Sequence, residues 1–524
     1  MGARAGTHNT IESWALHGGK WGSLDTAVYL QAGDTDGIDG IVARDAQTAN
    51  NIALGSSASL APGPVNTETE SIDGQLELSK NNWIFRAAYK LRDDVGSGAG
   101  ASQALDPNGE NSSKRLTADL TYHDPKFSQN WDVTLQAGYM YYNERSDLFL
   151  FPPGTVLGGA FPNGVIGNPY KWERHDRLSA SAFYTGFQEH RVRVGAGYEV
   201  SDLYKIRETR NYQLTFVPGT GYVPFPLGSI VDVTGTAPFI VPHKRTNKYL
   251  YVQDEWGFAN DWTLTAGLRH DDYSDFGTTT NPRLALVWEA AYNLTAKLLY
   301  GEAFRAPSFS ELYNINNPVL QGNPALKAEE IETLEAAISW QPQNDWQVNF
   351  NIFRYEMEDI IRAVPNTDPL TGSTTQNTGK QTGKGLEVEL TWYATKTIQL
   401  QGSYAYQEST DKATGKDAGL APNHQIYLRG DWRFSPRWSA SAQLNWVGDR
   451  KREPNDTRSK LGDYLLVDLT IRTNNRSNGW DYSFSVRNIF DEDAREPSPA
   501  PGLIPEDLPL PGRSIFAEAI YRFD

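Results

Sequence analysis

The chain contains no cysteine, which excludes a disulfide framework and any metal site built from thiolates. It has no run of about 18 apolar residues, the length that a transmembrane helix requires. The first residues, MGARAGTHNTIESW, lack the charged start and the apolar stretch of a secretory signal peptide. The formal net charge of −16 argues against nucleic-acid binding, which needs clustered Lys and Arg.

Apolar residues are also scarce. They make up 39% of the 524 residues, below the roughly 45–50% of soluble domains, whereas aromatic residues reach 12%, with 15 Trp and 26 Tyr. This combination does not suit several stacked soluble cores. It suits a wall with one thin apolar face and belts of aromatic side chains. No composition shift or linker divides the chain, so residues 1–524 are predicted to form one domain.

The stretch 385–407, GLEVELTWYATKTIQLQGSYAYQ, shows a pattern that recurs along the chain. In 386–392 apolar residues alternate with Glu387, Glu389 and Thr391, and a second alternating stretch follows the break at 394–397. A period of two indicates β-strands with one apolar and one polar face, here joined as a hairpin. In a soluble sandwich the apolar face would point inward, and in a membrane barrel it would face lipid.

The same pattern predicts hairpins from end to end. With a closing strand at 512–524 and a further strand within 1–8, they give about 22 strands. The predicted pairs are 9–18 with 20–33, 70–80 with 82–93, 113–124 with 130–146, 170–187 with 189–203, 245–259 with 261–274, 279–290 with 293–305, 325–342 with 345–362, 380–394 with 397–408, 422–434 with 437–450, and 460–474 with 479–490.

The predicted connections alternate between tight turns and long loops, which is typical of an outer-membrane barrel. A propeller would show a repeat of roughly 40–50 residues, and none is present. The tight turns are Gly18-Gly19-Lys20, Lys80-Asn81-Asn82, Ala259-Asn260-Asp261, Gln343-Asn344-Asp345 and Phe434-Ser435-Pro436. The loops, rich in Gly, Pro, Asn and Ser, are 34–69, 94–112, 147–169, 204–244, 306–324, 363–379 and 491–511.

Aromatic residues recur beside the tight turns and predict an interfacial belt, although aromatic residues near hairpin ends are the ordinary alternative. They are Trp21, Trp83, Trp131, Trp262, Trp346, Trp392, Phe434 and Trp438. The lumen would then carry polar side chains such as Glu387, Glu389, Gln399 and Gln401, because lipid does not solvate them. The sheet must also close, since an open edge in lipid leaves backbone groups unpaired.

The stretch 301–340 contains two short motifs, FRAP at 304–307 and NPALKAE at 323–329. With these motifs the chain resembles the TonB-dependent receptors of the Gram-negative outer membrane. The segment Phe304-Arg305-Ala306-Pro307 resembles the motif that begins a long extracellular loop of the family, and Asn323-Pro324-Ala325-Leu326-Lys327-Ala328-Glu329 resembles the opening of its next strand. The segment NFNIFRYEMEDII at 349–361 resembles the strand after that. The last strand, RSIFAEAIYRFD, is similar to the family's barrel-assembly signal, which ends on an aromatic residue; here Phe523 is followed by Asp524.

The resemblance implies an all-β fold: a single transmembrane, antiparallel, up-and-down β-barrel of about 22 strands, with short periplasmic turns and long extracellular loops. The family also has an N-terminal plug domain and a segment that a periplasmic energy-coupling protein grips. The sequence begins directly with barrel-like strands. We therefore expect residues 1–524 to form the barrel without a plug, and to depend on the plug and coupling protein only in a longer parent.

The resemblance further implies that the loops capture a scarce nutrient, such as a ferric siderophore or another metal chelate. Self-packing of the loops is the alternative explanation for their aromatic residues. The candidate contacts are Phe149, Phe151, Phe161 and Tyr170 in one loop, and Tyr204, Tyr212, Phe216, Tyr222 and Phe225 in another. The motif residues Phe304, Arg305, Pro307, Asn323, Pro324, Glu329 and Phe523 are interpreted as structural.

No metal or cofactor site is expected. Asp34, Asp36 and Asp39 in GDTDGIDG have a spacing that suits Ca²⁺, but no Glu follows at the twelfth position, so a solvated acidic loop is favoured. The chain has no His-Glu-x-x-His pattern and no Ser/His/Asp set in a supporting context, so no enzyme is expected.

Three hypotheses follow. The first is an outer-membrane transport barrel, expected to be a monomer surrounded by lipid and, without a plug, an open passive pore. The second is an extracellular ligand-binding or adhesion barrel with an occluded lumen. The third is a soluble all-β protein with a resurfaced wall, which the apolar outward positions in 386–392 and 398–406 disfavour.

Overall fold

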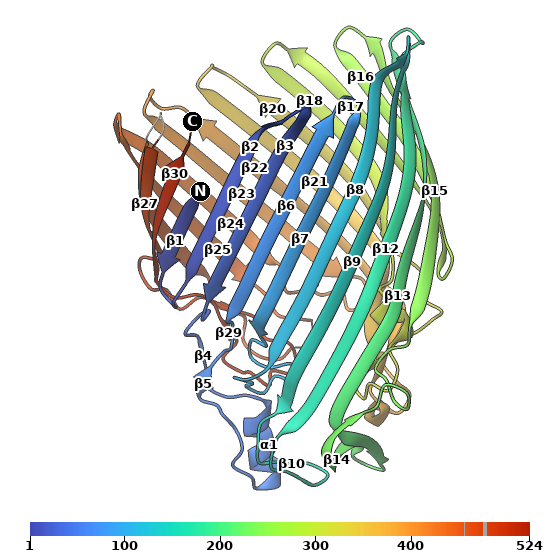
Figure 1. The fold of residues 1–524 in the computed structure, drawn as a ribbon, viewed down its shortest axis with the longest axis vertical. Coiled ribbons are helices and arrows are strands. Elements are labelled where there is room, and N and C mark those ends of the chain that lie inside the picture. The colour runs from blue at the N-terminus through green and yellow to red at the C-terminus, as the bar shows by residue number, and fades with distance from the viewer. Residues whose placement is uncertain (455, 475–478, 524) are drawn as a thin grey trace.

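A computed structural model describes residues 1–454, 456–474 and 479–523. One main sheet contains 24 strands, and without β14 (Gly221–Asp232) and β19 (Leu320–Gln321), which pair beside the ring, 22 strands remain in a closed barrel. Neighbouring strands of the ring are antiparallel, as the sequence predicted (Figure 1). Asp524, the last residue of the predicted strand 512–524, lies outside the described residues.

The strands of the ring differ widely in length, from 5 residues in β1 to 28 in β13. In ring order they are β1 (Gly2–Gly6), β2 (Ile11–Trp21), β3 (Leu24–Thr35), β6 (Thr69–Lys80), β7 (Trp83–Gly96), β8 (Glu110–Ser128), β9 (Trp131–Phe151), β12 (Val165–Tyr184), β13 (His190–Val217), β15 (His243–Ala259), β16 (Trp262–Tyr273), β17 (Gly277–Ala291), β18 (Leu294–Arg305), β20 (Glu329–Trp340), β21 (Trp346–Pro365), β22 (Ser373–Trp392), β23 (Ile398–Asp411), β24 (Pro422–Ser435), β25 (Trp438–Arg450), β26 (Tyr464–Thr473), β27 (Gly479–Arg487) and β30 (Ser514–Arg522).

Strand β1 closes the ring. Gly2 lies opposite Trp14 of β2 on one side and Ile520 of β30 on the other, and the terminal ammonium of Met1 donates to the carbonyl of Tyr521 at 3.0 Å. The two ends of the chain therefore lie next to each other (Figure 1). The prediction of a further strand within residues 1–8 is confirmed.

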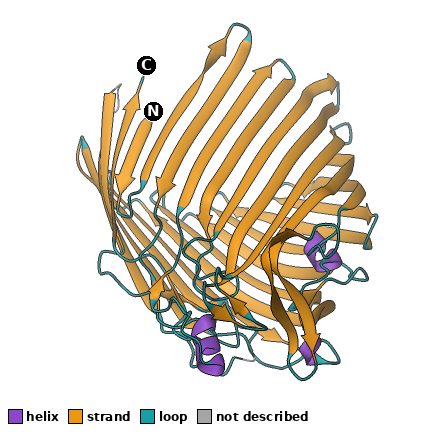
Figure 2. Cartoon of the chain, turned by 60° about the horizontal axis from the view of Figure 1, so that its bottom comes forward, coloured by secondary structure: helices purple, strands orange, loops and turns teal. Residues whose placement is uncertain are grey.

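Long loops gather at one end of the barrel and short turns at the other (Figure 2). The loop end holds the short helices α1 (Ala46–Leu54), α2 (Phe309–Tyr313) and η1 (Pro369–Thr371). It also holds the two-residue strands β4 (Ile41–Val42), β5 (Gly63–Pro64), β10 (Thr155–Val156), β11 (Ala160–Phe161), β28 (Arg495–Glu496) and β29 (Leu508–Pro509). No helix in the described ranges has the length and apolarity needed to cross a membrane.

The predicted turn Gly18-Gly19-Lys20 is wrong. These residues continue β2, where Gly18 lies opposite Ala27, and the chain instead reverses between Trp21 and Leu24. Gly22 has φ +63°, a left-handed conformation that glycine adopts without steric cost. The pair of glycines suggested a turn, but the register with β3 keeps both of them in the wall.

The predicted loop 204–244 is also wrong in large part. Strand β13 continues to Val217 and pairs with β14, so that a hairpin extends beyond the wall. Pro224 and Pro226 suggested a loop, but they are tolerated here because β14 is an edge strand, which in the described part of the chain pairs with β13 and with no other strand. Likewise the predicted loop 363–379 shrinks, because β21 reaches Pro365 and β22 begins at Ser373.

The two faces of the wall differ as the alternation predicted. Leucines at mid-height of the strands are widely exposed, for example Leu178 and Leu250 at 60% each and Leu428 at 48%. In the described part of the chain, the two clusters of buried apolar residues involve the loops rather than a core inside the ring. The apolar positions therefore face outward, and polar positions such as Glu387, Glu389, Gln399 and Gln401 face the lumen.

The predicted aromatic residues lie at the short-turn end of their strands. Trp21 is 76% exposed, and neighbouring strands bring Trp346 within 4.8 Å of Trp392, measured between ring centroids. Trp262 stacks on Trp288 in the same way, at 5.1 Å. Amphipathic rings at one level suit the boundary between hydrocarbon and headgroups, so the belt marks one edge of the membrane-spanning zone.

Candidate functional site

The loop end contains a first compact unit, which we call the seam cap, made from the loops 36–68, 97–109 and 488–513. Its centre consists of buried Val42, Val65, Leu105 and Ile504. Asp45, which is 1% exposed, holds two of these loops together. Its side chain accepts hydrogen bonds from the N–H of Thr48 at the start of α1 and from the N–H of Leu105. The seam cap thus joins loops from both ends of the chain.

Ion pairs connect the seam cap to the segment 449–463. Arg452 donates both Nη atoms to Asp507 at 2.6 Å, and Arg458 pairs with the same carboxylate at 3.4 Å. Within the segment, Arg458 also donates to Asp456 at 2.6 Å. The hydrogen bonds from Arg458 lower the pKa of Asp456 to about 2. Burial tends to raise the pKa of Asp507, but hydrogen bonds from Arg452 and from the N–H of Ser498 outweigh it, so that this pKa is lowered as well.

These pKa shifts predict a loosening of the segment in acid. Because the folded pKa of Asp456 lies below its ordinary value of 3.8, the pair with Arg458 stabilises the segment above that pH and the contribution disappears as the pH falls to about 2. Pepsin cleavage within 456–463, normalised to an unstructured peptide, should rise as the pH falls from 4 to 2. Asp456→Asn should reduce this rise without abolishing it, because protonation of Asp507 also weakens the segment, and equal wild-type rates at pH 4 and pH 2 would contradict the expectation.

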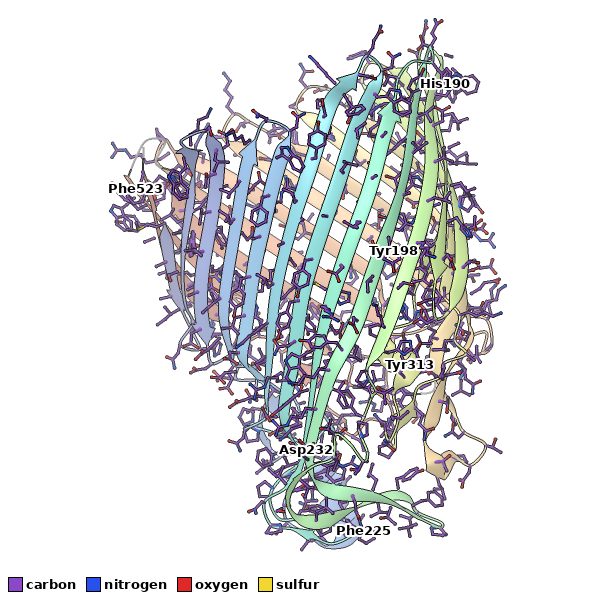
Figure 3. The ribbon with its side chains drawn as sticks, turned by 45° about the vertical axis from the view of Figure 1, so that its right-hand side comes forward. His190, Tyr198, Phe225, Asp232, Tyr313 and Phe523 are labelled. Carbon is purple, nitrogen blue, oxygen red and sulfur yellow. The ribbon has the colours of Figure 1, made fainter. Side chains whose placement is uncertain are left out.

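A second unit, the hairpin cap, lies where β13 leaves the wall. Leu203, Ile206 and Ile240 form its buried centre, and Phe239, Phe309 and Tyr313 pack against it. Burial raises the pKa of Glu208 there, although Arg210 and the N–H of Phe239 oppose the shift. Figure 3 shows Phe225 and Asp232 of β14 at the loop end, far from His190 at the opposite end of the barrel.

The loop 152–164 joins the two caps. On one side the hydroxyl of Thr155 donates to Gln47 of α1 at 3.1 Å, and both side chains are fully buried. On the other side the N–H of Gly158 donates to the carbonyl of Pro224 at 3.1 Å. The loops around this part of the rim therefore form one connected structure.

The two predicted aromatic clusters meet at this junction, but their members differ in exposure. Phe161 is 2% exposed, and Tyr170 is 7% exposed with the guanidinium of Arg145 4.9 Å above its ring, so both pack internally. Phe149, Phe151, Tyr212 and Phe225 are half-buried. Three remain exposed: Tyr204 at 39%, and Phe216 and Tyr222 at 38% each, the last two in edge-to-face contact at the hairpin end.

The motif residues surround the loop 306–324. Arg305 donates to Glu329 at 2.6 Å and 2.8 Å and to Glu311 at 2.9 Å and 3.0 Å, which connects β18, β20 and α2. Burial tends to raise the pKa of Glu311, but the hydrogen bonds from Arg305 and Ser308 lower it overall.

Two further motif residues, Pro307 and Asn323, hold the same loop. The carbonyl of Pro307 accepts from Arg245 at 2.8 Å, and Asn323 donates to the carbonyl of Thr375 at 3.0 Å. Phe304 lies 5.9 Å from Tyr273, and Pro324 is exposed at the surface. Phe523 is 62% exposed at the opposite end of the wall, beside Tyr521.

The described residues contain no group of three or more His, Asp or Glu side chains arranged to hold a metal ion. Asp34, Asp36 and Asp39, the weak calcium candidate, therefore do not form such a group. Asp36 accepts from the side chain of Asn9 at 2.6 Å, and Asp39 lies 3.2 Å from His8, so these carboxylates contact neighbouring side chains instead of converging.

Comparisons with known proteins agree with this architecture. The family model described as "TonB dependent receptor-like, beta-barrel" matches residues 21–489. The vitamin B12 transporter BtuB of Photobacterium profundum is 26% identical over 305 residues, which is 56% of this chain and 46% of that protein. The ferric enterobactin receptor PirA of Pseudomonas aeruginosa is 29% identical over 292 residues, which is 48% of this chain and 37% of that protein.

The chain thus spans less than half of the length of either of these relatives, which are a transporter and a receptor rather than enzymes. Among solved structures, the copper transporter OprC has a TM-score of 0.75 at 15% identity, covering 100% of this chain and 79% of that one. At that identity the likeness shows the fold. The family model, in contrast, matches most of the chain, so the protein belongs to the TonB-dependent receptor-like β-barrels of the Gram-negative outer membrane.

Proposed function

We propose that this barrel is the membrane-spanning part of a receptor that takes up a scarce nutrient, such as a ferric siderophore or a similar metal chelate. The observation that carries the proposal is the match of residues 21–489 to the family model on a closed 22-strand ring. The names of the relatives, which include a B12 transporter and a ferric enterobactin receptor, support the ligand class. The exposed rings of Phe216 and Tyr222 support a role of the hairpin end in contact with such ligands.

Ligand capture is tested by binding of ferric chelates to the detergent-solubilised chain. We expect saturable binding of at least one ferric siderophore, and Phe216→Ala with Tyr222→Ala should weaken it, because both rings are exposed. Phe161→Leu keeps a buried apolar side chain and serves as the control. Absence of binding to a panel of ferric siderophores and cobalamin would contradict the proposed ligand class.

We also propose that residues 1–524, when reconstituted without any other polypeptide, form a passive pore. About 22 strands enclose more space than their side chains fill. Polar side chains line this space, and one hollow near the short turns, with a volume of about 820 Å³, includes Gln399, Asp431 and Arg472. In planar bilayers we expect large, stable single-channel currents.

An extracellular binding or adhesion barrel with an occluded lumen is the second candidate. The connection of both caps through loop 152–164 favours it, because interlocked loops can restrict the mouth. Chelate binding without any current in planar bilayers would support this candidate and contradict the passive pore.

A further inference from the structure

Two rows of cations cross the outer face of the wall near the loop end of β8, β9, β12 and β13. In the first row, Lys114 lies opposite Asn143, and Asn143 lies opposite Trp172. Trp172 in turn lies opposite Lys205. The next row towards the loops adds two arginines, so we define a basic patch with four members: Lys114, Arg145, Lys205 and Arg207.

The basic patch faces away from the lumen. On β8, Leu116 and Leu120 share the parity of Lys114, and both are 42% exposed on the outer face. On β13 a bulge at Tyr204, opposite the step from Trp172 to Glu173, moves Lys205 onto the same outer face. Whatever fills the lumen of this barrel therefore leaves the basic patch uncovered.

The basic patch lies just beyond a second aromatic level of the outer wall. Tyr139 and Tyr198 are 41% and 42% exposed there. From Trp131 to Tyr139, a rise of roughly 3.3 Å per residue and a strand tilt of roughly 40° give a height of about 20 Å, close to the roughly 25 Å of an apolar band. Figure 3 shows Tyr198 between His190 at the short-turn end and Asp232 towards the loops. The patch thus lies at the level of the lipid headgroups on the loop side.

Three of the four cations have no carboxylate partner within the ranges that the structure describes. The Nζ of Lys205 lies 4.4 Å from the ring centre of Trp172, and the guanidinium of Arg145 lies over Tyr170. Lys114 forms no ion pair with any described residue. Only Arg207 has a partner, Asp232, at 3.3 Å, with both side chains about half exposed.

The carboxylates on this outer face do not neutralise the basic patch. Asp202 pairs with Arg174 at 2.8 Å, and Asp147 accepts a hydrogen bond from the hydroxyl of Tyr170. Asp176 lies further towards the apolar band, opposite Tyr139. In a chain with a formal net charge of −16, the two rows therefore form a local positive surface.

A buried amide without a partner lies between the two lysines. Asn143 is 6% exposed, and its Oδ1 has no hydrogen-bond partner among the described residues. A buried acceptor without a donor is unfavourable. A headgroup that carries hydroxyl or amide donors beside its phosphates would satisfy this atom, and the neighbouring Trp172 offers a ring against which a sugar can pack.

An apolar hollow of about 500 Å³ lies below the basic patch on the same strands and β7. From Lys114 to Leu120 at this hollow, the distance along β8 is about 20 Å, which an extended acyl chain with its linkage to a headgroup can span. Alanines make the floor of the hollow, and larger side chains make its sides: Ala137, Ala180, Ala196, Trp83, Leu178 and Tyr198.

We propose that the basic patch and the apolar hollow together bind one diphosphorylated glycolipid of the leaflet on the loop side. Three strand spacings separate Lys114 from Lys205 by about 14 Å, so one phosphate lies at Lys114 and Arg145 and the other at Lys205 and Arg207. One acyl chain lies in the hollow. The inference goes beyond the proposed function, because it concerns the outer face and requires neither nutrient binding nor an open lumen.

The test measures binding of diphosphoryl lipid A to the full chain by native mass spectrometry from an uncharged detergent. Lys114→Gln combined with Lys205→Gln should weaken binding at least fivefold. The matched control, Arg115→Gln combined with Lys171→Gln, removes the same charge from positions of opposite parity on β8 and β12 and should stay within twofold of the wild type.

The hollow is tested separately with Ala180→Phe, which fills its floor and should weaken binding at least threefold. Ala336→Phe is the control. Ala336 lies opposite outward-facing Ile352, on β20, away from the hollow, and this variant should bind within twofold of the wild type. Both substitutions add an apolar ring to the lipid-facing surface, so neither is expected to prevent folding.

The chemistry of the ligand is tested with two further probes. Lipid A without its phosphates should bind at least tenfold more weakly, and inorganic phosphate at the same concentration should not displace lipid A. Absence of lipid A binding, equal binding by the two lysine and arginine double variants, equal binding without phosphates, or displacement by inorganic phosphate would each overturn the proposal. Dimers that form without lipid and are lost in the Lys114/Lys205 variant would also overturn it, because they would assign this surface to a second copy.

The heat-dependent shift of the barrel on a gel reports folding of each variant. If the Lys114/Lys205 double variant does not fold, Lys114→Gln alone should weaken binding of lipid A at least twofold. Unchanged binding by this single variant would overturn the proposal.

Discussion

Leu428→Arg should lower the free energy of unfolding of the barrel in lipid vesicles by about 2–4 kcal/mol. Leu428 is 48% exposed on the outer face of β24, between Trp432 at the short-turn end and His424 towards the loops. A charged side chain near the middle of the lipid-facing band loses its hydration, and this cost is largest at the midplane. Urea titrations of the variant and the wild type in the same vesicles measure the difference.

Gln425→Arg is the matched control on the same strand. Gln425 has the opposite parity, is exposed, and faces the lumen, where a guanidinium remains hydrated. Its effect should stay within about 0.5 kcal/mol, the range of surface substitutions away from special features. Equal destabilisation by both arginines would mean that the two faces do not differ as described.

Arg305→Ala should lower the free energy of local opening of the loop 306–324 by about 1–3 kcal/mol. The change leaves Glu329, which is 7% exposed, without the two hydrogen bonds from Arg305. It also removes the two hydrogen bonds that Arg305 donates to Glu311. The lower part of the range applies if water reaches the site, because the Arg305 side chain is 48% exposed. Hydrogen exchange of the loop amides measures the change.

Arg513→Ala provides the comparison for Arg305. Its pair with Asp491 is 3.6 Å long, and both side chains are about half exposed, so the substitution should change stability by less than about 0.5 kcal/mol. An effect of Arg305→Ala no larger than that of Arg513→Ala would contradict a role of the motif in anchoring the loop.

The architecture of the wall was predictable because its physics is local. Alternation of apolar and polar residues sets the two faces of each strand, and lipid requires that the sheet close. The positions of individual turns were less predictable. A pair of glycines such as Gly18 and Gly19 is typical of a turn, and nothing in the residues themselves indicates that they lie in a strand. The hairpin of β13 and β14 was missed because its prolines lie on an edge, a fact that depends on which strands become neighbours.

The site was predictable only in outline. The sequence indicated which loops carry aromatic residues, but exposure is set by contacts between loops, and these bury Phe161 and Tyr170.

The orientation of the wall is tested most directly by single cysteines on β15, which is possible because the chain has no cysteine of its own. In proteoliposomes, Tyr251→Cys and Gln253→Cys should react with a water-soluble maleimide, whereas Leu250→Cys and Val252→Cys should not. A fluorophore attached at 250 or 252 before reconstitution should be quenched by spin-labelled lipid, and one at 251 or 253 should not. Reversed alternation, or the same behaviour at all four positions, would contradict an outward apolar face around a polar lumen.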